Sequence, residues 1–551
     1  MDMPLQGSLL HRILTPRPWK WDAWLLAACI AGAGLASLYL GQDMNWDLQN
    51  YHYYNPWAWL NGRIYTQDIV AAQLQTYHNP LPDIPFYLMV KAGWRPRTIA
   101  FLLAVPTGVA AYFLAKLLAV LFRNVPRRER WLWIAVALVV GLTSGMAVAV
   151  LGTTMNEWPG AALTIAALYL LVRALATAPT RPLARNTLLA AGFLCGLATG
   201  AKLTFGVYAV GLCVAILLRG PWRPAYFTSA FREAFVFGLA VLAGTAVTAG
   251  AWMWALWSRF ANPIFPYANI WFKSPWWGEY EVMGRRYGPH TLAEWLAFPF
   301  RLASPPPFFV TEQAYTDWRI PALYLLALLS GAAWIGQCVA EKRRDGGSVF
   351  GRFSRTSPAW RVVGIFWVVS FLIWTAQYSI YRYLVPLELL SGALLVALLR
   401  YLLRSGVAAP AAAALGVALV ASTQWPDWWR GDFGRKWFDV NVPYVAPNAL
   451  VLLVTDGPMA YVLPYFPADA RHFGLNNNIN DPERDTLMEE AIARAIREHK
   501  GPMYSLAYPS GQGADVLAAH HLVQFPELCR DVKTNMRTSP IQLCQLTRIP
   551  Q

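Results

Sequence analysis

Long apolar runs separated by short polar segments dominate the chain from residue 22 to residue 424. About 20 apolar residues cross the hydrocarbon core of a bilayer as a helix, so these runs predict about 11 transmembrane helices. The fifth and sixth runs are short and flank a GAKLT break, which is typical of irregular backbone facing a cavity. The predicted spans are 22–40, 98–122, 131–151, 159–175, 187–200, 203–218, 233–257, 320–340, 361–377, 383–401 and 407–424.

The pattern changes after residue 424, where short alternating runs replace the long apolar ones. Residues 448–456, 502–508 and 541–549 have the pattern of strands, and residues 487–500 have that of an amphipathic helix. We therefore predict two domains. Residues 1–424 form an all-α polytopic membrane domain, and residues 425–551 form a small α/β domain.

Basic residues cluster in alternate loops, which predicts the orientation of the helices. The net charge is +15, yet charged residues are only 14% of the chain and the mean hydropathy is +0.32. The basic excess is thus explained by the cytoplasmic bias of such loops, and no nucleic-acid partner is expected. The bias places the N-terminus in the cytoplasm and three long segments on the outer face of the membrane: 41–97, 258–319 and 425–551. Cys529 and Cys544 lie in the last of these, where a disulfide can form.

The first outer segment carries two acids, Asp43 and Asp47, directly after the first span. Helical spacing of apolar residues after Asp47 predicts an interfacial helix that Gly62 ends. Sugar transfer to a hydroxyl needs a base, and an ionised Asp47 beside a helix N-terminus can serve, with Asp43 as the fallback. The alternative is that both acids are solvated loop residues or helix caps.

Other charged residues at predicted outer turns can complete a pocket. Glu157 offers a second carboxylate or, alternatively, only begins a helix ahead of Pro159. Lys202 can bind a phosphate as a point charge or simply snorkel to the interface. The remaining candidates for phosphate binding are Arg382, Arg285 and Arg286.

Aromatic residues and histidines surround these acids. Tyr51 and Trp57 can stack on a sugar or line a lipid pocket, although an interfacial belt explains most aromatic residues here. His52 and His78 can ligate a divalent metal together with Asp47, or act as ordinary hydrogen-bonding residues.

The arrangement resembles the GT-C superfamily of integral-membrane glycosyltransferases. The matching residues are an acid in the first outer loop, then a tyrosine, a small residue and a glycine, then an NP-L turn: Asp47, Tyr51, Ala58, Gly62, Asn79, Pro80 and Leu81. The chain departs from the common pattern because Leu48, not a glutamate, follows Asp47, which raises interest in Asp43 and Glu157 as second acids.

The resemblance implies an inverting transferase that moves a hexosyl or pentosyl group from a polyprenyl-phosphate carrier to a glycan, lipid or protein. It implies that Asp47 is the base and that Asn79 lies at the pocket. Two alternatives stay open: an O-antigen ligase or polymerase that uses diphosphate-linked oligosaccharides, and a transporter or flippase of lipid-linked sugar. A transporter is expected to place ionisable residues near the midplane and to show repeated halves, whereas this sequence has its acids at the rim and no repeat.

Overall fold

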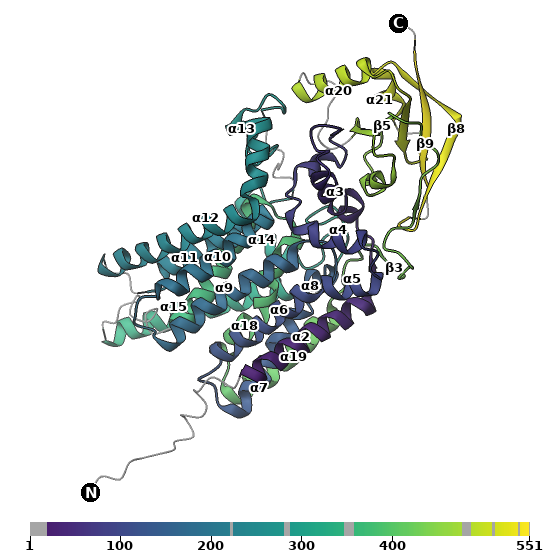
Figure 1. The fold of residues 1–551 in the computed structure, drawn as a ribbon. Helices are drawn as coiled ribbons and strands as arrows, with labels where there is room; N and C mark the ends of the chain where they lie inside the picture. Colours follow the sequence, from purple (N-terminus) through teal and green to yellow (C-terminus); the bar gives the residue numbers. More distant parts are fainter. Residues whose placement is uncertain are drawn as a thin grey trace.

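The computed structural model describes residues 19–220, 224–279, 287–345, 357–476, 486–509, 513–537 and 540–549. One end of the molecule is a bundle of long helices, and the other end carries irregular segments and a β-sheet (Figure 1). The helices of the bundle are α2 (Trp19–Leu40), α5 (Pro96–Leu103), α6 (Val105–Leu121), α7 (Arg127–Leu142), α8 (Gly145–Ala149), α9 (Glu157–Thr177), α10 (Arg185–Ala201), α11 (Gly206–Leu218), α12 (Pro224–Phe260), α15 (Arg319–Asp345), α17 (Pro358–Gln377), α18 (Val385–Leu402) and α19 (Ser405–Ser422).

Helices occupy every stretch that the sequence predicts as a span. Within the described residues, seven stretches are long and apolar enough to cross a membrane: Asp22–Leu40, Pro96–Leu121, Glu157–Thr177, Tyr226–Phe260, Arg319–Ala340, Pro358–Gln377 and Tyr381–Leu402. Leu203–Leu218 and Gly406–Ser422 are apolar but shorter. The helical membrane architecture is therefore as expected, whereas the count of 11 spans stays a prediction.

Close helix packing in the bundle depends on glycines four residues apart. Gly192, Gly196 and Gly200 lie along α10, and a Cβ at any of them would overlap atoms of α12. Small residues at this spacing let two backbones approach closely. Such close packing favours helix association in lipid, where the hydrophobic effect does not drive helices together. The glycine stripe consequently fixes the position of the end of α10 against α12.

The first outer segment folds into several short elements above the bundle. A π-helical turn, η1 (Leu48–His52), follows Asp47 and leads into α3 (Tyr54–Leu60). Gly62 then has a φ of +64°, so the glycine ends the helix as the sequence predicts. The segment continues through β2 (Asp68–Ile69), η2 (Gln73–Tyr77), η3 (Leu81–Asp83) and α4 (Ile84–Lys91).

The second outer segment has few regular elements among its described residues. It contains α13 (Asn269–Phe272) and α14 (Leu292–Arg301), and Thr291 caps α14 by accepting a hydrogen bond from the Glu294 amide. Two further 3-10 turns, η4 (Leu203–Phe205) and η5 (Tyr381–Leu384), precede α11 and α18 at the same end of the bundle.

The C-terminal region forms a mixed sheet with the order β2-β6-β5-β7-β9-β8-β4. Its strands are β4 (Val440–Asn441), β5 (Leu450–Leu453), β6 (Arg471–Gly474), β7 (Met503–Ala507), β8 (Leu522–Thr534) and β9 (Ile541–Arg548), while β3 (Arg430–Gly431) pairs with β1 (Gln42–Asp43) instead. The 3-10 turn η6 (Ala460–Tyr465) and the helices α20 (Leu487–Glu498) and α21 (Ala514–Ala519) complete the region.

The edge strand β2 comes from the first outer segment and pairs in parallel with β6. The sequence analysis treats these two segments as separate pieces, but backbone pairing joins them into one sheet. The domain boundary after residue 424 stays a prediction, because part of the sheet is supplied from the other side of that boundary.

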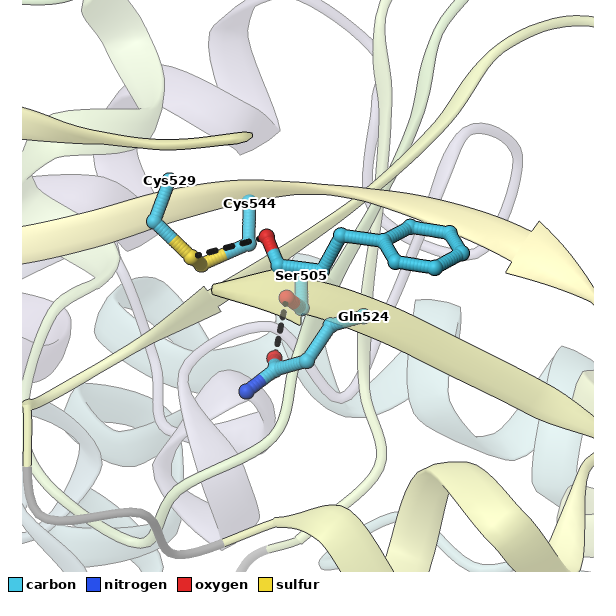
Figure 2. The surroundings of a disulfide bond; sticks show 5 residues. Ser505, Gln524, Cys529 and Cys544 are labelled. Carbon is cyan, nitrogen blue, oxygen red and sulfur yellow. Dashed lines mark hydrogen bonds between the residues drawn. A yellow bond between two sulfur atoms is a disulfide. The ribbon is translucent and has the colours of Figure 1, made fainter. Parts of the chain in front are cut away.

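A disulfide joins Cys529 on β8 to Cys544 on β9 (Figure 2). The two residues are direct partners across the antiparallel pair. Next to them, Ser505 on β7 donates a hydrogen bond of 3.0 Å to Gln524, so three neighbouring strands are cross-linked by side chains at this point.

Candidate active site

Four charged residues meet where helices end beneath the first outer segment. Asp47 follows α2, Glu157 begins α9, Lys202 ends α10, and Arg382 precedes α18. Arg382 Nη1 lies 3.0 Å from Asp47 Oδ2, and its Nε lies 3.8 Å from Glu157 Oε1. Lys202 Nζ donates to the same Glu157 oxygen. These four residues, hereafter the charge cluster, bring together parts of the chain up to 335 positions apart.

The π-helical turn after Asp47 determines what faces this carboxylate. In a π-turn the backbone bonds run from residue i to residue i+5, so positions four and five residues on lie over the first. Tyr51 accordingly donates a hydrogen bond of 3.4 Å to Asp47 Oδ2. The centre of its ring lies 4.1 Å from the centre of the His52 ring. Such turns are frequent at functional sites.

Asp47 is held ionised despite its burial. Burial raises the pKa of Asp47, but the positive charges of Arg382 and Lys202, and of His52 when it is protonated, outweigh this effect and lower the pKa below its usual value. The side chain is only 7% exposed, so it does not point into bulk solvent.

Glu157 is the most deeply buried member of the charge cluster. Its side chain has no exposed surface, whereas Lys202 keeps 17% and Arg382 keeps 13% of theirs. Among the described residues Glu157 Oε2 has no hydrogen-bond partner. The ammonium of Lys202 also lies 4.9 Å from the centre of the Tyr383 ring. The open side of the cluster is therefore lined by its two cations.

Two further carboxylates hold the loop that carries Glu157. Asp43 accepts hydrogen bonds from the amide and hydroxyl of Thr154 at 2.8 and 2.9 Å. Asp83 accepts a hydrogen bond of 3.1 Å from Asn156. Both acids are buried and hydrogen-bonded, and Asp43 contacts the loop that carries Glu157. The role of Asp43 as a fallback base stays a prediction.

Asn79 connects the first outer segment to the end of α10. Its amide donates to the carbonyl oxygens of Gly200 and Thr248, at 2.9 and 2.7 Å, and so lies beside the backbone that carries Lys202. His78, the residue before it, contacts the hydroxyl of Tyr267 at 2.8 Å. Burial lowers the pKa of His78 to about 3, so this imidazole is neutral at neutral pH.

The two histidines near Asp47 each contact a different side chain. His52 Nδ1 lies 2.9 Å from Asp83 Oδ1, while His78 contacts a tyrosine. In the part of the chain that the structure describes, no three His, Cys, Asp or Glu side chains are grouped so as to hold a metal ion.

Trp57 points toward the C-terminal sheet. The guanidinium of Arg63 lies 4.9 Å from the centre of its ring, and the ring of His472 lies at 6.4 Å. Arg285 and Arg286 fall outside the described residues, so their place relative to the charge cluster is not part of this description.

Sequence reasoning missed three residues that support the site. Asp83 contacts His52 and Asn156. The only sequence feature that marks it is its place in the proline-rich turn HNPLPD. Arg537 in the C-terminal region donates a hydrogen bond of 2.6 Å to Gln49, which is two positions after Asp47. Arg430 donates to the carbonyl oxygens of Ala149 and Leu151 at 2.9 and 2.7 Å. No local pattern marks these two arginines, because their partners are hundreds of positions away.

The arrangement has the parts that group transfer from a phosphate needs. A buried, ionised carboxylate can accept a proton from a hydroxyl, and two cations can stabilise the negative charge of a leaving phosphate. The cluster lies at the ends of apolar helices, where a lipid-borne phosphate would be found.

Comparison with solved structures identifies the class of fold. The crystal structure of ArnT from Cupriavidus metallidurans bound to undecaprenyl phosphate is similar over 96% of this chain and 98% of that one, with a TM-score of 0.50 and 12% sequence identity. An archaeal oligosaccharyltransferase, AglB from Archaeoglobus fulgidus in complex with an inhibitory peptide and a dolichol-phosphate, matches 89% of this chain and 70% of that one, with a TM-score of 0.41 and 13% identity. No family model and no curated protein matches the sequence.

The chain is thus similar in fold to the ArnT structure, as the expected resemblance predicts. Together with the apolar helices, this fold makes it a multi-pass membrane protein.

Proposed function

We propose that this protein is an inverting glycosyltransferase that moves a sugar from a polyprenyl-phosphate carrier to a glycan, lipid or protein acceptor. The observation that carries the proposal is the charge cluster, in which an ionised carboxylate lies beside two partly exposed cations. The similarity in fold to ArnT, which was solved with undecaprenyl phosphate bound, supports the same class of donor.

Asp47 is the general base of the proposed reaction. It takes the proton of the acceptor hydroxyl while the acceptor oxygen attacks the anomeric carbon. Lys202 and Arg382 bind the phosphate that leaves with the lipid, and both already lie beside carboxylates that hold them in place. Glu157 orients the cations, and Tyr51 orients Asp47 through its hydroxyl.

The first outer segment and the C-terminal sheet lie at the same end of the bundle (Figure 1), and the first outer segment carries Asp47 of the cluster. The basic loops predict that this end faces the periplasm of the bacterial inner membrane. The reaction is therefore proposed for that face, where carriers present their sugars outside the cytoplasm.

Substituting Asp47 tests the proposal. We expect Asp47→Asn to reduce transfer at least 100-fold, as loss of a general base typically does, because the amide keeps the shape but accepts no proton. Turnover by the purified variant with a polyprenyl-phosphate sugar donor is the measurement, with thermal unfolding as the control for folding. Turnover equal to that of the wild type would reject the assignment of Asp47.

A further inference from the structure

His52 is a buried imidazole with a carboxylate beside one of its two nitrogens. The residue is 1% exposed, and its Nδ1 lies 2.9 Å from Asp83 Oδ1. Its Nε2 is equally buried and has no hydrogen-bond partner among the described residues. An unpaired buried polar atom destabilises a folded protein, so its presence needs an explanation beyond packing.

His52 and Asp47 lie at the two ends of one π-helical turn. His52 is five positions after Asp47, which is the spacing of the backbone hydrogen bonds in such a turn. The ring of Tyr51, whose hydroxyl donates to Asp47, lies 4.1 Å from the ring of His52. The imidazole therefore belongs to the immediate surroundings of the proposed base.

Asp83 is itself fixed, so it can fix the imidazole in turn. It accepts a hydrogen bond from Asn156 and is 3% exposed. A carboxylate beside one imidazole nitrogen orients the ring and stabilises the imidazolium that forms when the other nitrogen takes a proton. The Asp83–His52 pair is thus arranged so that the second imidazole nitrogen can accept a proton.

We propose that the Asp83–His52 pair is the final proton acceptor of the transfer reaction. This inference rests on the proposed function. The acceptor O–H bond breaks as the new bond to the anomeric carbon forms, and the bond from that carbon to the phosphate oxygen breaks with its electron pair leaving on the phosphate. The released proton passes through the Asp47 carboxylate to His52 Nε2, and the imidazolium is balanced by Asp83.

The charges around His52 suit this role. Burial lowers the pKa of His52, but Asp83 and Asp47 outweigh burial and raise the pKa above its usual value, against an opposing effect of Lys202. His78 also lies close by but is neutral, since burial lowers its pKa to about 3. A protonated Asp47, whose own pKa is lowered, is therefore a stronger acid than the imidazolium and gives up its proton to His52.

The pH dependence of turnover tests the inference with His52→Gln. His52 must be neutral to accept a proton, so wild-type kcat is expected to fall as pH decreases through the raised pKa of this residue. In His52→Gln we expect kcat to be about 100-fold lower and that acidic limb to disappear, with the KM for the donor within about 2-fold of the wild type. A variant that keeps the wild-type acidic limb would overturn the inference.

A second variant, Asp83→Asn, separates proton transfer from a structural role. Loss of the carboxylate removes the charge that raises the pKa of His52, so the acidic limb should move to lower pH. A residue that only braces the loop would lower kcat equally at every pH and leave the limb in place, which would also count against the inference.

The wild-type assay separates the two proposals. If the wild type transfers sugar and Asp47→Asn does not, but both the His52 and Asp83 variants keep the wild-type limb, then only this inference fails. If the wild type transfers no sugar from any polyprenyl-phosphate donor, the proposed function fails, and the inference fails with it.

Discussion

At the scale of single residues, the charge cluster is paired throughout before any substrate arrives. Asp47 pairs with Arg382, and Glu157 pairs with Lys202. Breaking such a buried pair by removing one partner leaves an uncompensated charge. The cations are therefore held in position by carboxylates, and a phosphate can share them without rearrangement of the backbone.

Lys202→Ala is expected to raise the KM for the lipid-linked donor about 10-fold, because one of two phosphate-binding cations is lost. Initial rates at varied donor concentration are the measurement. Lys116→Ala is the matched control, since Lys116 also pairs with a carboxylate, Asp22, but between α2 and α6. An unchanged KM in Lys202→Ala would move the phosphate site elsewhere.

At the scale of elements, the glycine stripe of α10 positions Lys202. Gly200 is two residues before Lys202 and lies against Thr245 and Thr248 of α12. Asn79 holds the same point from the first outer segment through Gly200 and Thr248. The packing of α10 against α12 and the hydrogen bonds of Asn79 therefore both hold the end of α10, where Lys202 follows.

Gly196→Ala is expected to destabilise the protein, although alanine favours a helix over glycine by about 1 kcal/mol. The added methyl would overlap the Val241 carbonyl, so α10 and α12 must separate. The control is Gly238→Ala on α12, where nothing lies within 4 Å of the added Cβ and a small gain is expected. Thermal unfolding in detergent compares the two variants, and equal behaviour would contradict the packing argument.

At the scale of the whole molecule, a buried ionic network joins the first outer segment to the C-terminal sheet. Arg63 forms an ion pair of 2.9 Å with Asp68 on β2 and donates to the carbonyl oxygens of Ala468 and Ala470. His472 on β6 lies 2.9 Å from the same carboxylate. The sheet and the segment that carries Asp47 are thus one folded unit.

Arg63→Met is expected to lower the free energy of unfolding by about 3–5 kcal/mol, because Asp68 would stay buried without its main partner. Arg494→Met is the matched control, since Arg494 forms an exposed pair with Glu490 on α20 and its loss should cost about 0–1 kcal/mol. Chemical unfolding followed by tryptophan fluorescence measures both. Equal effects would show that Arg63 does not link the two segments energetically.

The orientation of the whole molecule is testable by labelling. A cysteine at exposed Lys500, in the C-terminal region, should react with an impermeant thiol reagent on intact cells. A cysteine at Arg123, in a predicted cytoplasmic loop, should react only after lysis. The opposite pattern would invert the orientation and place the charge cluster on the cytoplasmic face.

Much of the fold could be predicted because its signals are local. Apolar runs predict the helices of the bundle, and short strand-like runs predict β5, β7 and β9. The helix α20 follows from Met488, Ile492 and Ile496, which are buried at a spacing of four residues. The strands β2 and β6 were missed, since they are too short to show a period. They form by pairing with segments distant in sequence, β2 with β6 and β6 also with β5.

For the candidate site, the sequence alone determined which residues carry charge at the rim of an apolar bundle. An acid or a cation beside a membrane span is costly, so Asp47, Lys202 and Arg382 stand out without any structure. Only the tertiary structure decided that Asp43 braces a loop, that Asp83 faces His52, and that arginines of the C-terminal region reach the first outer segment. These contacts join distant parts of the chain, and composition and periodicity report on neighbours along the chain rather than neighbours in space.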